Sequence, residues 1–316
     1  MYGYSANEKT IFFQAAKKTP TDREVYSLNI DSKKIQLLSN SSGTNDASFS
    51  SNYNYFINTH SDANNPFVIT LNDQKGKLLK VLEDNKSLLN KMNDFDLVEK
   101  IFFSIPNDNN IDLNAWIMKP ELLDTNKKHP LLIYVYGGPG INTVNNAWSW
   151  MNYFWFQYLV KQGFVVASVD NRGTGYRGKE FKHATYLQLG KLETEDQIDA
   201  AIHMGKLNYI DKDRIGIFGW SYGGYMSSLC ISKGADVFNS AIAVAPVTNW
   251  RYYDNIYTER FMRTPKENGD NYDINSPINH VRKIKGNYLL INGTAYHNVH
   301  FQNSMEIVNS LVKENK

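Results

Sequence analysis

The chain has 316 residues, and its 34 basic and 32 acidic side chains leave a formal net charge of +2. This length can hold one large domain or two medium ones with a sizeable core, whereas the balanced charge gives no electrostatic basis for binding nucleic acid or an anionic membrane. No apolar run approaches the ~18 residues of a membrane span, and the N-terminus lacks the basic and apolar regions of a signal peptide, so neither feature is expected and the compartment stays open.

Residues 1–95 have the pattern of antiparallel β-structure. Short apolar segments alternate with polar turns, which predicts strands at Thr10–Gln14, Glu24–Asn29, Lys34–Leu38, Tyr53–Asn58, Phe67–Leu71 and Leu78–Leu82. The pattern recurs about every 40 residues, which is typical of a β-propeller blade. About two blades fit in this segment, and a closed propeller needs ~4–8. The alternatives are therefore the terminal blades of a propeller and an independent β-meander.

Residues 96–316 show strands alternating with helices. An antiparallel pair is predicted at Val98–Ser104 and Asp112–Met118. Continuous apolar runs predict buried parallel strands at Pro130–Tyr136, Phe164–Val169, Arg214–Phe218, Ser240–Ala245 and Tyr288–Ile291. Helices are predicted at Glu193–Lys206, Tyr225–Ile231 and Gln302–Lys313. This alternation predicts an α/β domain with a mostly parallel sheet.

Apolar side chains mark the faces by which these helices are expected to pack. In the first helix they are Ile198, Ala201, Ile202 and Gly205, and in the last they are Ile307, Val308 and Leu311. Cys230 lies on the apolar face of the middle helix and is the only cysteine. An intrachain disulfide is therefore excluded, and a buried thiol is predicted.

The segment Gly219-Trp-Ser-Tyr-Gly223 has the G-x-S-x-G form of a nucleophile elbow. This elbow is a sharp strand-to-helix turn that exposes a serine hydroxyl. Glycine is needed on both sides because a strained turn beside a helix leaves no room for Cβ atoms. A predicted strand precedes the motif and a predicted helix follows it. This context favours a nucleophile at Ser221 over an incidental serine in a glycine-rich turn, and it indicates an α/β-hydrolase domain.

A nucleophilic serine needs a base to take its proton and an acid to orient that base. In this fold the acid follows the serine in the chain, and the histidine comes after the last strand. Only His280, His297 and His300 follow Ser221. His280 precedes the last predicted strand, and the other two lie where the acid is expected. The sequence therefore offers no histidine at the expected place before it ends at Lys316.

The oxyanion of the tetrahedral intermediate needs hydrogen-bond donors. Tyr222, directly after the serine, would offer its backbone N–H. The segment Tyr136-Gly-Gly-Pro-Gly140 follows a buried strand at its carboxyl end, where α/β sheets place ligands. It could supply the Tyr136 hydroxyl or a nearby backbone N–H. On position alone, this segment is equally an ordinary Gly-Pro turn.

Three aromatic residues follow the strand that ends at Ala245. Trp250, Tyr253 and Tyr257 share one face at spacings of three and four if this segment is helical. Rings at that spacing usually belong to a core. Their place after a strand on the catalytic side predicts a flat apolar pocket.

Together these segments resemble the prolyl oligopeptidase family of serine peptidases, and within it the dipeptidyl peptidase IV group. The motifs that carry the resemblance are Tyr136-Gly-Gly-Pro, Asp170–Gly178, Glu195–Ile198, Gly219–Tyr225, Ala245–Trp250, Tyr252–Arg260, Asn292-Gly-Thr-Ala and Asn298–Gln302. They cover nearly all of residues 96–316. The resemblance implies a peptidase domain of the α/β-hydrolase fold there, after about two propeller blades at residues 1–95.

The resemblance also implies a role for each matching residue. Ser221 would form an acyl-enzyme, with the Tyr222 N–H and the Tyr136 hydroxyl as the oxyanion hole. The residues implied to contact substrate are Val247, Trp250, Tyr253, Tyr257, Asn298 and Val299. The implied reaction releases Xaa-Pro or Xaa-Ala dipeptides from peptide N-termini, without a cofactor or a metal. The resemblance also allows a homodimer.

The sequence departs from the family in three ways. The family's loop reads Gly-Thr-Ala-Asp-Asp-Asn, and its first aspartate orients the catalytic histidine, but here Tyr296 stands at that position. The family's histidine lies on a loop beyond the helix at Gln302–Lys313, so it is expected to be absent, together with the last strand and helix of the domain. The paired glutamates that bind the substrate amine belong to propeller blades outside residues 1–95.

Because the triad works as a unit, the loss of one member leaves only about 10³–10⁴-fold catalysis over water. The sequence therefore predicts little or no peptidase activity for these 316 residues. The alternatives are a catalytically inactive fragment, a peptide-binding pseudoenzyme and a slow esterase. A further hypothesis is that His297 acts as a replacement base, which requires hydrogen-bond reach of Ser221.

Overall fold

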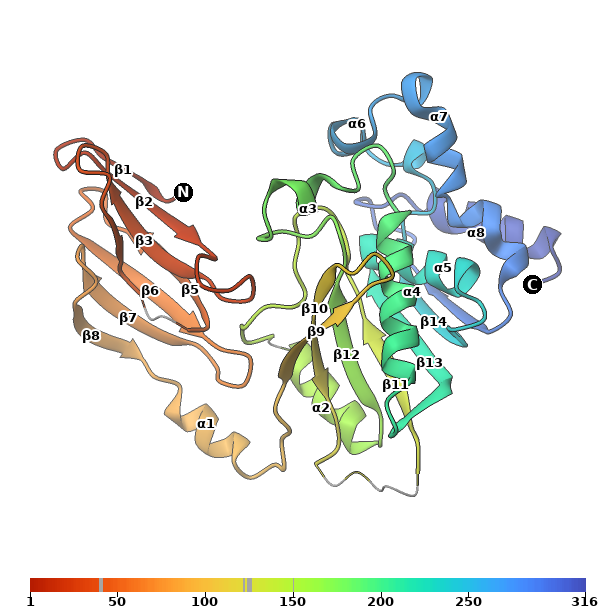
Figure 1. Cartoon of the computed structure of the whole chain (residues 1–316), viewed down its shortest axis with the longest axis horizontal. Coiled ribbons are helices and arrows are strands. Elements are labelled where there is room, and N and C mark those ends of the chain that lie inside the picture. Colours follow the sequence, from red (N-terminus) through yellow and green to blue (C-terminus); the bar gives the residue numbers. More distant parts are fainter. Residues whose placement is uncertain (40–41, 122, 124–126, 150) are drawn as a thin grey trace. The chain divides into compact units, whose positions relative to one another are not determined.

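The computed structural model describes residues 1–39, 42–121, 123, 127–149 and 151–316 (Figure 1). The chain forms two compact units. The N-terminal unit comprises Met1–Lys100 with Asn145–Gln157, and the C-terminal unit comprises Ile101–Val144 with Tyr158–Lys316. Within the described residues, no helix combines the length and the apolar character that crossing a bilayer requires.

Two antiparallel four-stranded sheets make up most of the N-terminal unit. One contains β1 (Gly3–Ser5), β2 (Thr10–Ala15), β3 (Glu24–Asn29) and β4 (Ile35–Leu37), and the other contains β5 (Thr44–Phe49), β6 (Tyr55–Ser61), β7 (Val68–Asp73) and β8 (Leu78–Glu83). Both sheets contribute to one buried core, which includes Phe12, Val25, Leu38, Ala47 and Phe56. A short helix, α1 (Lys86–Met92), follows β8. The arrangement confirms the prediction of about two propeller blades.

The sequence pattern predicts six of these eight strands and misses β1 and β5. The β5 segment reads Thr-Asn-Asp-Ala-Ser-Phe, and asparagine and aspartate disfavour strands. Nevertheless, β5 pairs with β6 along its whole length. The buried Asn45 side chain in it donates a hydrogen bond to the Arg23 carbonyl at 3.0 Å. Tertiary pairing, rather than local propensity, forms this strand.

A seven-stranded sheet is the centre of the C-terminal unit, in the order β15-β14-β13-β11-β12-β10-β9. The strands are β9 (Ile101–Pro106), β10 (Asp112–Met118), β11 (His129–Tyr134), β12 (Val165–Asp170), β13 (Ile210–Trp220), β14 (Ser240–Val244) and β15 (Asn287–Ile291). The five neighbouring strands β12, β11, β13, β14 and β15 pair in parallel. Strand β10 is antiparallel to both of its neighbours, β12 and β9. This sheet confirms the predicted antiparallel pair and the α/β-hydrolase fold.

Helices alternate with these strands along the chain. They are α2 (Met151–Lys161), α3 (Lys179–His183), α4 (Leu192–Gly205), α5 (Tyr222–Lys233), α6 (Asn255–Met262), α7 (Pro265–Ile274) and α8 (Gln302–Lys313), with 3₁₀ turns η1 (Trp250–Tyr252) and η2 (Pro277–Lys283). Figure 1 shows α4 and α5 beside the strands around β13, and both helices contact that strand. Cys230 on α5 is fully buried, as predicted.

Two predicted helix faces are partly wrong. In α4, Ile202 is 42% exposed, whereas Glu193, Asp196 and Gln197 are buried. The interior tolerates these polar side chains because each of them has hydrogen-bond partners there. In α8, Val308 is exposed although its neighbour Ile307 is buried.

Candidate active site

Ser221 lies at the turn between β13 and α5, with φ 58° and ψ −113°. This backbone conformation is strained for a residue with a Cβ atom. The Ser221 N–H donates a hydrogen bond to the Val244 carbonyl at 2.8 Å. A Cβ atom on Gly219 would overlap the Gly223 carbonyl group, and one on Gly223 would overlap the Val135 carbonyl oxygen. Close backbone packing therefore explains both glycines of the elbow and holds the serine in its conformation.

The side chains of Tyr136 and Tyr222, the two residues predicted to supply oxyanion donors, lie together beside this turn. Tyr222 is the first residue of α5, so its N–H has no acceptor within the helix. The Tyr136 and Tyr222 ring centroids are 5.9 Å apart. A Cβ atom on Gly138 would lie 2.7 Å from the Tyr136 ring and 3.0 Å from the Tyr222 ring. The loop after β11 thus packs directly on Tyr222 and is more than an isolated Gly-Pro turn.

The Tyr136 hydroxyl is suited to donate a hydrogen bond rather than to ionise. Burial raises the pKa of Tyr136, and the neighbouring Tyr253, Tyr296 and Tyr134 side chains raise it further. The hydroxyl therefore stays protonated at neutral pH. A protonated phenol can stabilise negative charge on a carbonyl oxygen.

The aromatic residues after β14 form one cluster, but the prediction that they share a helical face is wrong. The chain leaves η1 after Tyr252, runs extended through Tyr253, and enters α6 only after Asp254, whose carboxylate accepts the Tyr257 N–H at 2.9 Å. The rings nevertheless meet, with Trp250 and Tyr257 centroids 5.8 Å apart and Tyr253 and Tyr257 centroids 5.4 Å apart.

The remaining substrate-contact residues differ in exposure. Val247 and Val299 are almost completely buried in the hydrophobic core of the C-terminal unit. Asn298 is exposed and lies in the neighbourhood of Tyr253. Tyr296, at the position of the family's aspartate, is half-buried and packs against the same core. Its electrostatic influence on Tyr253 places it in the neighbourhood of the aromatic cluster.

Ser221 has no base among the contacts that the described residues make. In that part of the chain no hydrogen bond joins the Ser221 hydroxyl to a histidine or a carboxylate. His297 and His300 both lie exposed in the loop between β15 and α8. No cluster of histidine, cysteine, aspartate and glutamate suited to a metal ion occurs among the described residues either.

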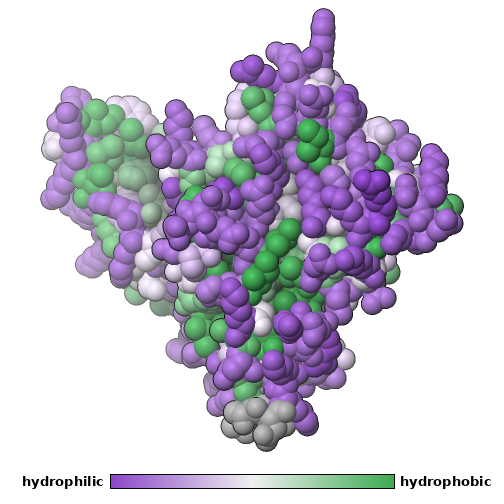
Figure 2. All heavy atoms as spheres, turned by 45° about the vertical axis from the view of Figure 1, so that its right-hand side comes forward, coloured by the Kyte–Doolittle hydropathy of each residue, from purple (hydrophilic) through white to green (hydrophobic). Residues whose placement is uncertain are grey.

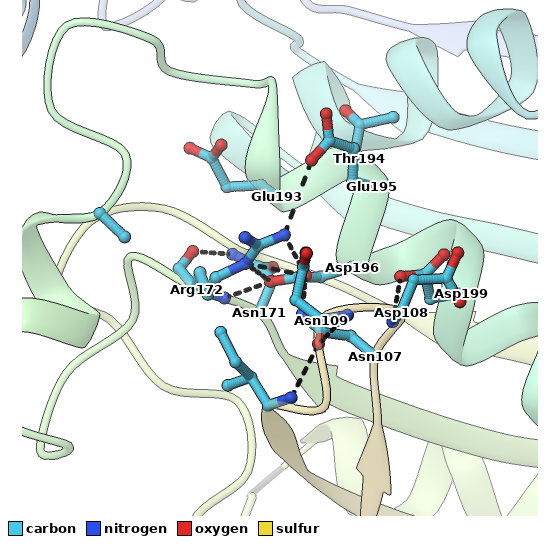
Figure 3. Close-up of polar contacts among 12 residues, drawn as sticks. Asn107, Asp108, Asn109, Asn171, Arg172, Glu193, Thr194, Glu195, Asp196 and Asp199 are labelled. Atoms are coloured by element: carbon cyan, nitrogen blue, oxygen red, sulfur yellow. Dashed lines mark hydrogen bonds and ion pairs between the residues drawn. The ribbon is translucent and has the colours of Figure 1, made fainter.

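A buried polar network behind the site was not assigned a role from the sequence (Figure 3). Asp196 on α4 accepts hydrogen bonds from the Arg172 Nη2 at 2.7 Å and from the Arg172 backbone N–H at 2.7 Å. It also accepts one from the Asn107 side chain at 2.8 Å. Asp196 is fully buried, so this charge is compensated entirely by these partners. The network ties the β9–β10 turn and the loop after β12 to α4.

Two other polar side chains of α4 reach toward the oxyanion donors. Glu193 Oε1 accepts a hydrogen bond from the Tyr222 hydroxyl at 2.7 Å. Gln197 donates to Asn171 Oδ1 at 3.0 Å, and Asn171 in turn donates to the Gly137 carbonyl at 3.0 Å. The signal in the sequence is polar residues at helical spacing on the face that also carries Ala200, Ala201 and Met204.

Comparison with known proteins agrees with this geometry. Residues 150–316 match the model of the prolyl oligopeptidase family, and residues 1–67 match the dipeptidyl peptidase IV N-terminal region. A probable dipeptidyl-aminopeptidase B of Arthroderma benhamiae is 37% identical over 98% of the chain, and a probable dipeptidyl peptidase 4 of the same organism is 37% identical over 96%. The crystal structure of Porphyromonas gingivalis dipeptidyl peptidase 4 matches 99% of the chain with a TM-score of 0.95 and 44% identity.

The chain spans only part of these relatives. It covers 34% of the dipeptidyl-aminopeptidase B, 40% of the dipeptidyl peptidase 4 of Arthroderma benhamiae and 44% of the Porphyromonas gingivalis structure. The family match nevertheless takes in more than half of the chain, including the elbow, the aromatic cluster and the β15–α8 loop. The chain therefore belongs to the prolyl oligopeptidase family of serine peptidases.

Proposed function

We propose that this chain carries the acyl-transfer site of a dipeptidyl peptidase IV-type enzyme. Ser221 attacks the carbonyl after the second residue of a peptide, and the Tyr222 N–H with the Tyr136 hydroxyl stabilises the oxyanion. The aromatic cluster of Trp250, Tyr253 and Tyr257 accepts a small penultimate side chain such as proline or alanine. The reaction needs no cofactor.

The observation that carries this proposal is the strained Ser221 turn held directly against Tyr136 and Tyr222. The φ of 58° at Ser221 and the 5.9 Å distance between the Tyr136 and Tyr222 ring centroids support the proposal, because they bring both tyrosines close to the elbow. Such pre-organised donors are worth about 10²–10³-fold in rate for each one. We propose that the apolar faces of these aromatic rings accommodate a proline ring better than a branched or charged side chain.

The residue at position 296 bears on how fast the chain is expected to hydrolyse a peptide. A tyrosine at this position supplies no carboxylate to orient and stabilise a triad histidine. We therefore propose that the 316-residue chain binds substrate but hydrolyses it slowly. Binding with no turnover at all is the second candidate, favoured by the absence of a base among the hydrogen-bonding partners of Ser221 in the described residues.

A dipeptide boronate that ends in boroproline tests the site without requiring turnover. Its boron atom bonds to a serine oxygen, and the resulting tetrahedral boronate mimics the oxyanion intermediate. We expect the wild-type chain to bind glycyl-boroproline at least about 10²-fold more tightly than Ser221→Ala, measured by calorimetry. A boroleucine analogue is the specificity control and should bind more weakly. Equal affinities of wild type and Ser221→Ala would overturn the proposal.

Release of p-nitroaniline from Gly-Pro-p-nitroanilide then separates the two candidates. A rate above that of Ser221→Ala identifies a slow peptidase, and tight boronate binding without such release identifies a binding module. The variant Tyr296→Asp restores the acidic residue but not a histidine for it to orient, so we expect it to leave the rate within about threefold of wild type. A rate raised about 10-fold or more in this variant would contradict this expectation and would show that a base already acts on Ser221.

A further inference from the structure

We infer that two side chains of helix α4 position the oxyanion hole. Glu193 holds Tyr222, and Gln197 holds the Tyr136–Gly137 segment through Asn171. This inference rests on the proposed role of Tyr222 and Tyr136 as oxyanion donors. It assigns positioning roles to two buried side chains that do not touch the proposed substrate.

The contact between Glu193 and Tyr222 links α4 to the nucleophile elbow. Tyr222 is the residue after Ser221, and its hydroxyl donates to Glu193 Oε1 at 2.7 Å. The other carboxyl oxygen of Glu193 accepts the Gly190 N–H at 3.0 Å. Glu193 is fully buried, and Tyr222 is nearly so. Since both ends of this contact are held, the Tyr222 ring cannot shift without breaking a buried hydrogen bond, and its backbone N–H is fixed with it.

The contact between Gln197 and Asn171 links the same helix to the other half of the hole. Gln197 is four residues after Glu193, so both side chains lie on one face of α4. Gln197 donates to Asn171 Oδ1 at 3.0 Å and to the Val169 carbonyl at 2.9 Å. The Asn171 amide donates to the Gly137 carbonyl at 3.0 Å. Asn171 and Gln197 are both fully buried, so these hydrogen bonds are shielded from bulk solvent.

The Arg172–Asp196 pair lies on the same helix but serves a different contact. Figure 3 shows the Glu193 carboxyl turned away from the Arg172 guanidinium, which pairs with Asp196. Glu193 therefore faces the elbow with no arginine beside it. Burial raises its pKa to about 7, and its hydrogen bonds with Tyr222 and Gly190 oppose that shift. The charged or titratable groups that interact with it electrostatically are Asp196 on α4, Tyr222, Tyr225 and Lys233 on α5, and Tyr257 on α6.

The NMR signal of the Tyr222 backbone N–H can detect the contact between Glu193 and Tyr222 without a measurement of catalysis. In protein labelled with ¹⁵N-tyrosine, the Tyr222 amide signal is assigned by its loss in Tyr222→Phe. We expect this signal to move between about pH 5 and 8 in the wild type, following ionisation of Glu193. In Glu193→Gln the titration should vanish while the signal stays close to its wild-type position at low pH. A Tyr222 signal that titrates equally in Glu193→Gln would overturn the inference.

Glu195→Gln is the matched control, because it makes the same chemical change two residues away on an exposed side chain of α4. Glu195 makes only a 3.6 Å ion pair with Arg172, and its own side chain is about half exposed. The Tyr222 titration should persist in this variant. If Glu195→Gln abolished it as well, the titration would reflect the general field of the helix rather than the Glu193 contact.

Boronate affinity tests the effect on the oxyanion hole. We expect Glu193→Leu and Gln197→Leu each to weaken glycyl-boroproline binding by about 10-fold or more, while Glu193→Gln, which keeps a hydrogen-bonding group, stays within about threefold of wild type. Equal binding by Glu193→Leu and wild type would contradict the inference. If Ser221→Ala binds as well as wild type, the proposed function fails, and the Tyr222 amide titration still decides the Glu193 contact.

Discussion

Gly219 and Gly216 lie on the same strand, β13, but their surroundings differ. A Cβ atom on Gly219 would overlap backbone of the elbow, whereas one on Gly216 would meet its nearest atom, in the Leu132 side chain, at an ordinary 3.5 Å. We expect Gly219→Ala to lower the free energy of unfolding by about 1–3 kcal/mol and to abolish boronate binding. Gly216→Ala should change stability by less than about 1 kcal/mol. Urea denaturation measures both, and equal losses would contradict this account of the elbow.

Glu193 should also impose a pH dependence on stability. Its pKa is about 7 in the folded chain and ordinarily 4.5, so the folded state holds its proton more tightly. Below about pH 4.5 the Glu193 carboxyl is protonated in both the folded and the unfolded state, so its ionisation does not lower the free energy of unfolding. As the pH rises to about 7, folding becomes less favourable, by at most roughly 3 kcal/mol.

The variant Glu193→Gln removes this titration, and the comparison cancels the contributions of all other groups. We expect the stability of wild type relative to Glu193→Gln to fall between about pH 4.5 and 7 and to level off above that range. Urea midpoints measured at several pH values in this window provide the test. A constant difference between the two proteins would mean that Glu193 ionises in the folded state as it does in the unfolded one.

Helix α4 depends on a buried ion pair that joins it to two loops. Asp196 is fully buried and binds Arg172 and Asn107, so its removal leaves the Arg172 guanidinium without its closest counter-charge. We expect Asp196→Ala to cost about 3–5 kcal/mol of unfolding free energy. The exposed pair of Arg214 and Asp211 is the control, and Asp211→Ala should cost no more than about 1 kcal/mol. Similar costs for the two variants, measured in urea, would rule out a special role for the buried pair.

The elements of the C-terminal unit were largely predictable from sequence because their strands are continuous apolar runs. The β5 strand was not, since its polar residues are held by pairing with β6. Ser221, Tyr222 and Tyr136 could be proposed as site residues from the sequence because turn chemistry is local and the glycines beside them mark it. Glu193 and Gln197 were missed for the opposite reason. Their partners, Tyr222 and Asn171, are 29 and 26 residues away, and only the folded chain brings them together.

At the scale of the whole molecule, unpaired sheet edges and apolar surface determine how the chain behaves in solution. β8 is the edge strand of its sheet, and all six of its residues are exposed. Leu79 and Val81 are each 47% exposed. Figure 2 shows hydrophobic surface among the hydrophilic residues in several places, including the region of the small sheets. An exposed apolar edge strand is a template for pairing with another chain.

We therefore expect the 316-residue chain to associate as its concentration rises, and the double variant Leu79→Lys/Val81→Lys to reduce that association. Charge on an edge strand opposes edge-to-edge pairing without removing core contacts, so the thermal midpoint should stay within a few degrees of wild type. The control is the double variant Ile256→Lys/Val312→Lys, which adds the same two charges at apolar residues that are 89% and 69% exposed, on helices α6 and α8. Light scattering across a concentration series measures the effect. If this control reduced association as much as Leu79→Lys/Val81→Lys, net charge rather than the β8 edge would be responsible.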